Sequence, residues 1–143
     1  MEQLRLGVIG IGGMGSGHCA SMDKIKEARL AAICDIDPEI TNAASEKYGV
    51  PGFGRAEELI DSGLVDAVII ATPHYFHPPY AVYAFERGIH VLSEKPIAVT
   101  VSAADEMIAA ARKSGCKFGV MYQMRALARC RAAGIFKFFV DKA

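Results

Sequence analysis

Short apolar runs recur along the chain and are separated by longer, more polar stretches. Residues 4–9, 28–34, 65–71, 89–93 and 118–122 have the length and composition of β-strands, and a shorter extended piece is expected near Phe53. The run at 65–71, VDAVIIA, is almost continuously apolar and β-branched, which is typical of a strand buried on both faces of a parallel sheet. We therefore expect this strand at the centre of the sheet.

Helical patterns fill the intervals between these strands. A proline pair at 78–79 suits the first turn of a helix, since a proline there loses no intrahelical hydrogen bond, and Gly88 suits its end. Ser102, with Asp105 three residues later, resembles a capping arrangement for a helix that runs to residue 114. The other predicted helices cover the apolar spacing of Met14, His18, Met22 and Ile25, and residues 39–48 and 55–62.

Strand and helix alternate throughout, with connections that are too long for hairpins. This order favours a parallel sheet with helices on both faces, an α/β fold of the doubly wound type. A length of 143 residues suits one domain with its own core. The sequence contains neither an internal repeat nor a low-complexity linker.

Composition and charge exclude several classes of partner. A hydrophobic content of 52%, a charged content of 22% and a net charge of +0 describe a globular chain without the excess of Lys and Arg that nucleic-acid binding needs. No apolar run approaches the roughly 20 residues that cross a bilayer, and the N-terminal segment lacks the pattern of a secretory signal. We expect a cytoplasmic protein with no membrane partner. Its four widely spaced cysteines predict buried, reduced thiols.

The most glycine-rich stretch is GVIGIGGMG at residues 7–15, between the first predicted strand and the first predicted helix. In a Gly10-x-Gly12-x-x-Gly15 loop, the first glycine allows a tight turn, the second lets a pyrophosphate approach the backbone, and the third allows close packing of helix on strand. Gly13 adds further room, and we expect Met14 to lie over the ligand. The loop predicts a nucleotide site at the helix N-terminus.

An acidic residue supports this prediction. Asp35 lies 20 residues after Gly15, at the end of the second predicted strand, where a carboxylate can bind both hydroxyls of an adenosine ribose. The plainer alternative is a glycine turn followed by a helix-capping aspartate. Ile36 and Asp37 follow with no arginine nearby, so a 2′-phosphate would be repelled and NAD is favoured over NADP.

Three later motifs each follow a predicted strand: ATPHYFH at 71–77, SEKP at 93–96 and YQMR at 122–125. Together with the glycine loop and the D-x-D-P turn, they make residues 4–125 resemble the N-terminal half of the Gfo/Idh/MocA family, which includes glucose-fructose oxidoreductase and inositol dehydrogenase. The Glu-Lys-Pro sequence is the most specific element. An S-adenosylmethionine site also uses a glycine loop, but it leaves the Thr-Pro and Glu-Lys-Pro segments unexplained.

The resemblance implies an NAD(P)-binding Rossmann fold and hydride transfer between a nicotinamide cofactor and an alcohol of a sugar, polyol or similar small molecule. It places Lys95 as the catalytic residue, which contacts substrate and nicotinamide and assists proton transfer, and it places Arg125 near the substrate. The expected cofactor contacts are Gly10, Ile11, Gly12, Gly13, Met14, Gly15, Asp35, Ile36, Thr72, Pro73, His77, Glu94 and Lys95.

Two plainer explanations compete for individual residues. Glu94 and Lys95 could form a solvated ion pair of little energetic value. His74 and His77, spaced H-x-x-H, could bind a metal, but the sequence shows no third ligand cluster and we expect no metal. The remaining histidines, His18 and His90, are expected to be structural.

Family members ordinarily continue into a second α/β domain that lines the substrate pocket and supplies an Asp-x-x-x-His pair. Here residues 1–125 are the predicted Rossmann domain, and residues 126–143 are a tail with a short helix and an apolar segment at 135–140. The chain is either a truncated product or a single-domain relative, and the apolar segment could add an edge strand or pair two chains in a homodimer.

We therefore expect the chain to bind NAD and to lack full catalysis alone. The alternatives are a non-catalytic NAD-responsive sensor or interaction module, and a vestigial fragment that folds without function.

Overall fold

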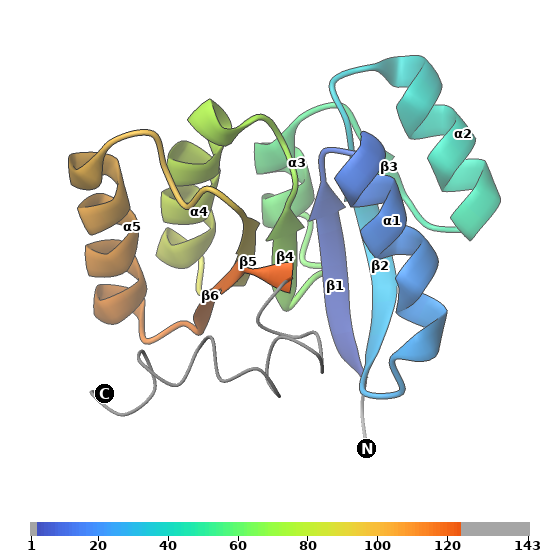
Figure 1. The fold of residues 1–143 in the computed structure, drawn as a ribbon. Coiled ribbons are helices and arrows are strands. Elements are labelled where there is room, and N and C mark those ends of the chain that lie inside the picture. The colour runs from blue at the N-terminus through green and yellow to red at the C-terminus, as the bar shows by residue number, and fades with distance from the viewer. Residues whose placement is uncertain (1–2, 124–143) are drawn as a thin grey trace, which may run out of the picture.

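The computed structural model describes residues 3–123. Within this range the strands form one all-parallel sheet in the order β3-β2-β1-β4-β5-β6 (Figure 1). The chain order therefore reverses between β1 and β4, which are hydrogen-bonded neighbours. This arrangement confirms the predicted parallel sheet. The strands are β1 (Leu4–Ile9), β2 (Ala28–Cys34), β3 (Gly52–Phe53), β4 (Ala67–Ile70), β5 (His90–Glu94) and β6 (Phe118–Met121).

Helices cover both faces of the sheet, as the doubly wound pattern requires. Figure 1 shows α1 and α2 on one face and α3, α4 and α5 on the other. Two short 3-10 turns, η1 (Met22–Lys24) and η2 (His74–Phe76), precede β2 and α4. The helices are α1 (Gly13–Ser21), α2 (Pro38–Tyr48), α3 (Ala56–Asp61), α4 (His77–Glu86) and α5 (Val101–Ser114). None of the helices in the described part is long and apolar enough to cross a membrane.

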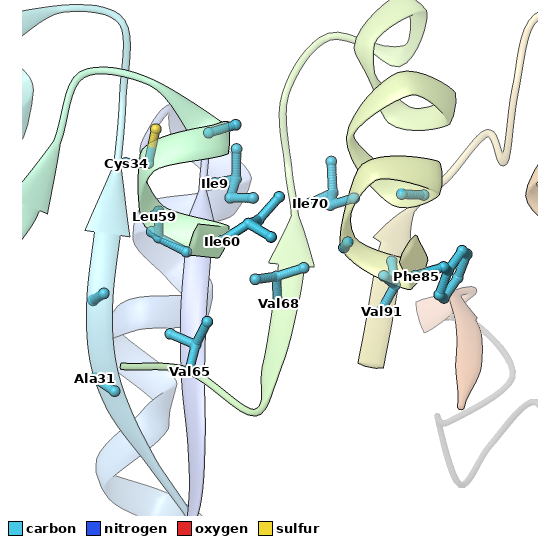
Figure 2. Packing of buried hydrophobic residues seen from close by; sticks show 14 of the residues in the cluster. Ile9, Ala31, Cys34, Leu59, Ile60, Val65, Val68, Ile70, Phe85 and Val91 are labelled. Atoms are coloured by element: carbon cyan, nitrogen blue, oxygen red, sulfur yellow. The ribbon is translucent and has the colours of Figure 1, made fainter. Parts of the chain in front are cut away.

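The core has two layers, one on each side of the central strand. Val68 and Ile70 of β4 pack with Leu59 of α3 and Phe85 of α4 (Figure 2). Ile69, the residue between them, packs into the second cluster under α1 and α2. Successive side chains of a strand point to opposite faces, so all of β4 is buried. This confirms the prediction of a central strand.

Helix ends show where the sequence signals succeed and fail. The α4 helix carries its proline pair in the first turn, as predicted. The predicted cap of α5 at Ser102 is wrong: α5 begins at Val101, and Thr100 is its N-cap, with Oγ1 accepting a hydrogen bond from the Ala103 amide at 3.2 Å. Thr100 has the extended backbone that an N-cap needs, whereas Ser102 lies within the first turn.

The first helix is shorter than its apolar spacing indicates. The α1 helix ends at Ser21, and Met22 begins the 3-10 turn η1, so the spacing from Met14 to Ile25 spans two elements and the start of a connection. Met22 and Cys19 are nevertheless buried against the sheet. Met14 and Ile25, the two ends of the predicted spacing, are exposed at 45% and 42%, so the prediction of one apolar helix face from Met14 to Ile25 is wrong.

Polar contacts join neighbouring strands at their amino ends. Asp66, just before β4, accepts hydrogen bonds from the Arg5 amide at 2.9 Å and from the Arg5 guanidinium at 2.6 Å. These hydrogen bonds lower the pKa of Asp66. His90 Nδ1, at the start of β5, accepts from the Lys117 amide at 3.1 Å, just before β6. This end of the sheet is thus fixed by side chains that belong to no predicted site.

The cysteines in residues 3–123 are free. Burial raises the pKa of Cys19 to about 11, and burial together with nearby acidic groups raises the pKa of Cys34 to about 12. The prediction of buried thiols is confirmed for Cys19 and Cys34 and is wrong for Cys116, which is partly exposed. Cys130 lies outside the described residues.

Candidate functional site

The glycine loop joins β1 to α1 in a conformation that side chains would disturb. Gly10 has a positive φ of 88°, and a Cβ there would lie 2.9 Å from the backbone at Ala71. A Cβ on Gly15 would lie only 1.7 Å from the Gly10 carbonyl oxygen. A Cβ on Gly12 would meet nothing within 4 Å. The loop therefore packs tightly at its first and third glycines and leaves bare backbone at its second.

The N-terminus of α1 suits an anion. Gly12 is the N-cap, no side chain caps the helix, and its first turn has no acidic residue. The first amides of a helix have no intrahelical acceptor, and the helix dipole makes that end positive. The space beside Gly12 is open, since a Cβ there would meet no atom within 4 Å, and such a helix end is a typical place for a phosphate group. Met14 follows with its side chain 45% exposed beside this end.

Asp35 lies directly after β2 and contacts the loop. Its Oδ2 accepts a hydrogen bond from the Ile11 amide at 2.7 Å, and its Oδ1 accepts from the Asp37 amide at 3.0 Å. Each carboxylate oxygen retains a further acceptor site for a ligand hydroxyl. Asp37, rather than Asp35, caps the following helix, which excludes the plainer explanation of Asp35 as the cap. Next to it, Ile36 is 92% exposed.

A histidine connects the loops that follow β4 and β5. The His77 side chain is buried, with Nε2 2.8 Å from the Thr72 carbonyl oxygen and Nδ1 2.9 Å from the Pro96 carbonyl oxygen. The Lys95–Pro96 peptide bond is cis. These contacts show that His77 connects the two loops. A contact of His77 with a cofactor stays a prediction. Pro73, in the first of these loops, is exposed.

The end of β5 holds a buried carboxylate. Glu94 is 4% exposed, its Oε1 lies 2.8 Å from His18 Nε2, and its Oε2 accepts a hydrogen bond from the Lys95 amide at 3.2 Å. The alternative of a solvated ion pair between Glu94 and Lys95 is therefore wrong. Lys95 itself is exposed at the carboxyl end of the sheet.

Sequence reasoning missed the partner of Glu94. It took His18 only as structural, and the two residues are 76 positions apart. One signal was present: His18 follows Gly15 by three residues and so shares a helix face with the glycine that packs on β1. Arg125, predicted on the substrate side, lies outside the described residues. Residues 3–123 contain no group of three or more His, Cys, Asp or Glu that could hold a metal ion.

The remaining site residues meet at one end of the sheet. The glycine loop and Asp35 follow β1 and β2, and Thr72 and Lys95 follow β4 and β5, on the other side of the reversal in chain order. A glycine loop on one side of such a reversal, with an acidic residue after the second strand, defines a dinucleotide-binding Rossmann domain. The sequence model of the Gfo/Idh/MocA oxidoreductase family, described as an NAD-binding Rossmann fold, matches residues 4–122. The chain belongs to this family.

Individual relatives agree with the family assignment. Inositol 2-dehydrogenase of Arthrobacter sp. (strain FB24) is 38% identical over 120 residues, which cover 81% of this chain and 35% of the relative. Glucose-6-phosphate 3-dehydrogenase of Bacillus subtilis (strain 168) is 29% identical over 123 residues, which cover 86% of this chain and 35% of that protein. The chain thus spans about a third of the length of these curated relatives.

A solved structure supports the family assignment by its three-dimensional similarity to this chain. Scyllo-inositol dehydrogenase of Lactobacillus casei, with bound NAD(H) and scyllo-inositol, superimposes with a TM-score of 0.90 at 26% sequence identity. The match covers 96% of this chain and 41% of that chain. The likeness extends over the whole Rossmann domain.

Proposed function

We propose that the chain is the cofactor-binding domain of an NAD-dependent dehydrogenase that transfers a hydride between nicotinamide and an alcohol of a sugar, polyol or similar small molecule. The observation that carries this proposal is the meeting of the glycine loop, Asp35 and Lys95 at one end of the sheet, on both sides of the reversal in chain order. The names of the relatives, two of which act on inositols, support the substrate class.

The first half of the site is suited to the adenosine and pyrophosphate. Asp35 would accept hydrogen bonds from the ribose hydroxyls, because amides at Ile11 and Asp37 already hold its carboxylate in place. Exposed Ile36 offers apolar surface to the adenine. A 2′-phosphate would place negative charge against the Asp35 carboxylate, so we propose NAD rather than NADP as the cofactor.

The second half of the site is suited to the nicotinamide and the substrate. Thr72, Pro73 and Lys95 lie in the connections after β4 and β5, and His77 begins α4 while Glu94 ends β5; together they would border this end of the cofactor. The bound nicotinamide supplies the hydride acceptor or donor. Oxidation of an alcohol also releases a proton, which the neutral Lys95 amine would accept as the hydride leaves; in the reverse direction the Lys95 ammonium would stabilise the developing negative oxygen and return the proton. We propose that Arg125 contributes from the substrate side.

Calorimetric titration of the purified chain with NAD, NADH, NADP and NADPH tests the proposal. We expect the two non-phosphorylated cofactors to bind more tightly. An Asp35→Ser variant should bind NAD more weakly and NADP more tightly, since it removes both the ribose acceptor and the repulsion. A folded chain that binds none of the four would overturn the proposal, and equal affinity for NAD and NADP would overturn the cofactor preference.

For the rest of the chain we retain the division into a Rossmann domain at 1–125 and a tail at 126–143. We propose a cytoplasmic location and a homodimer that forms through the apolar segment 135–140, which lies outside the described residues. The composition and apolar pattern of the sequence support both. Sedimentation should show a dimer that Phe138→Asp and Phe139→Asp together convert to a monomer, and a wild-type monomer at high concentration would refute the dimer.

A further inference from the structure

The backbone that carries Lys95 is held on both sides by histidines from different helices. On one side, Oε2 of Glu94 accepts a hydrogen bond from the Lys95 amide. Its Oε1 lies 2.8 Å from Nε2 of His18, a residue of α1. On the other side, the Pro96 carbonyl oxygen lies 2.9 Å from Nδ1 of His77, a residue of α4. Lys95 therefore extends into solvent from a backbone whose position depends on two ring contacts.

Burial makes the contact between His18 and Glu94 important for this arrangement. The side chain of Glu94 is 5% exposed and that of His18 is 16% exposed. A buried carboxylate without a donor is strongly unfavourable, and breaking a buried pair by removing one partner leaves that cost uncompensated. Loss of His18 would therefore let Glu94 turn toward water, and the hydrogen bond to the Lys95 amide would be lost with it.

The location of the pair gives it a function beyond local stability. His18 belongs to α1, whose first turn forms the anion site in the part of the site suited to adenosine and pyrophosphate. Glu94 is the last residue of β5, which lies two strands away from β1, in the part of the site suited to the nicotinamide. The pair therefore crosses the reversal in chain order and connects the helix that would bind the pyrophosphate to the loop that would meet the nicotinamide.

We propose that His18 is a positioning residue: through Glu94 it fixes the Lys95 backbone and thereby the nicotinamide end of the site. This role rests on the proposed NAD-binding function. It predicts that His18 affects the binding of the complete dinucleotide and leaves the adenosine diphosphate part of the site unchanged.

Two probes, NAD and ADP, separate these effects in calorimetric titrations of the chain. ADP ends at the pyrophosphate and does not reach the loop of Lys95. For His18→Ala we expect NAD affinity to fall about tenfold, as for the loss of one charge-assisted hydrogen bond, and ADP affinity to stay within about twofold. His18→Gln should recover most of the loss, because its side-chain amide can donate to Glu94.

His90→Ala is the matched control, since His90 accepts a backbone hydrogen bond at the opposite end of the same strand. It should leave the affinities for both ligands unchanged. Glu94→Gln keeps the size of the side chain and removes its charge, and it should weaken NAD binding as His18→Ala does. The double variant should lose no more NAD affinity than the weaker-binding single variant, because both changes disrupt one contact.

The outcomes are distinct. An equal loss of NAD and ADP affinity in His18→Ala would show general support of the glycine loop and overturn the positioning role. Unchanged NAD affinity, or additive losses in the double variant, would also overturn it while the proposed function stands. If His18→Ala does not fold, Glu94→Gln and His18→Gln decide. For each of these variants, the NAD affinity and the ADP affinity are compared with those of the wild type. A wild-type chain that binds neither NAD nor ADP would overturn the proposed function itself.

Discussion

Gly12 and Gly15 lie three residues apart in the glycine loop and make opposite predictions for the same substitution. A methyl group on Gly15 would lie 1.7 Å from the Gly10 carbonyl oxygen and 2.8 Å from the Gly10 carbonyl carbon. A methyl group on Gly12 would meet no atom within 4 Å. Alanine at the two positions therefore separates the packing of the loop from the binding of its ligand.

Gly15→Ala should destabilise the fold. The obstructing atoms are backbone, which cannot rotate away, so α1 and the end of β1 must move apart by about 1 Å or more before the methyl group fits. Overpacking of this kind costs about 3 kcal/mol of unfolding free energy. NAD affinity should fall as well, since the helix N-terminus moves with α1.

Gly12→Ala should leave the fold nearly intact. The backbone of Gly12 has φ −64° and ψ −163°, which alanine can adopt, so the change costs at most about 1 kcal/mol through the weaker N-cap. The methyl group would, however, enter the open space that a pyrophosphate needs. We expect NAD affinity to fall by about tenfold or more, which corresponds to about 1.4 kcal/mol.

Urea unfolding monitored by circular dichroism and calorimetric titration with NAD measure the two quantities on the same samples. The reasoning predicts a stable Gly12→Ala protein that binds poorly and an unstable Gly15→Ala protein. It would be refuted by a Gly15→Ala protein as stable as wild type, or by undiminished NAD affinity in Gly12→Ala.

Three further substitutions or reagents test the fold. Hydrogen bonds from Arg5 lower the pKa of Asp66, so the stabilisation by this pair is fully present above about pH 4 and is lost as the pH falls further and the carboxyl protonates. Asp66→Asn should be less stable than wild type by about 1 kcal/mol at pH 7, a figure discounted for partial exposure, and this difference should shrink as the pH falls below about 4 in urea titrations. Phe85→Ala should lose about 4 kcal/mol in the same assay, because Phe85 is buried in the core, and a loss under 1 kcal/mol would contradict that packing. Iodoacetamide at pH 7.5 should modify Cys116 and spare Cys34 until the protein unfolds, as peptide mass mapping would show; fast modification of Cys34 in the native protein would disagree.

The sheet was largely predictable because its strands are buried on both faces. A strand such as β4 can avoid polar positions altogether, so the run at 65–71 identified it, although the structure limits the strand to Ala67–Ile70. Helix ends were less predictable, since they depend on which residue adopts an extended backbone. Thr100 and Ser102 both have the hydroxyl of a cap, and the geometry of the chain selects Thr100.

The candidate site was predictable where its signals are local. The spacing of the glycines in the loop indicates its conformation directly, and Asp35 lies 20 residues after Gly15. The pairing of His18 with Glu94 is different, because it depends on how α1 lies across the end of β5. The spacing of His18 from Gly15 places His18 on the helix face toward the sheet, but it does not identify Glu94 as the partner. The contacts of His77 with the carbonyl groups of Thr72 and Pro96 are of the same kind.

The two ends of the sheet carry separate tasks. Contacts such as that between Arg5 and Asp66 tie the strands together at their amino ends, whereas the residues expected to meet ligands lie in loops at the carboxyl ends. A change in a loop on the ligand side therefore leaves the contacts at the amino ends of the strands in place. Ligand recognition in this domain could consequently change by substitutions in the connecting loops while the amino-end contacts continue to hold the strands in register.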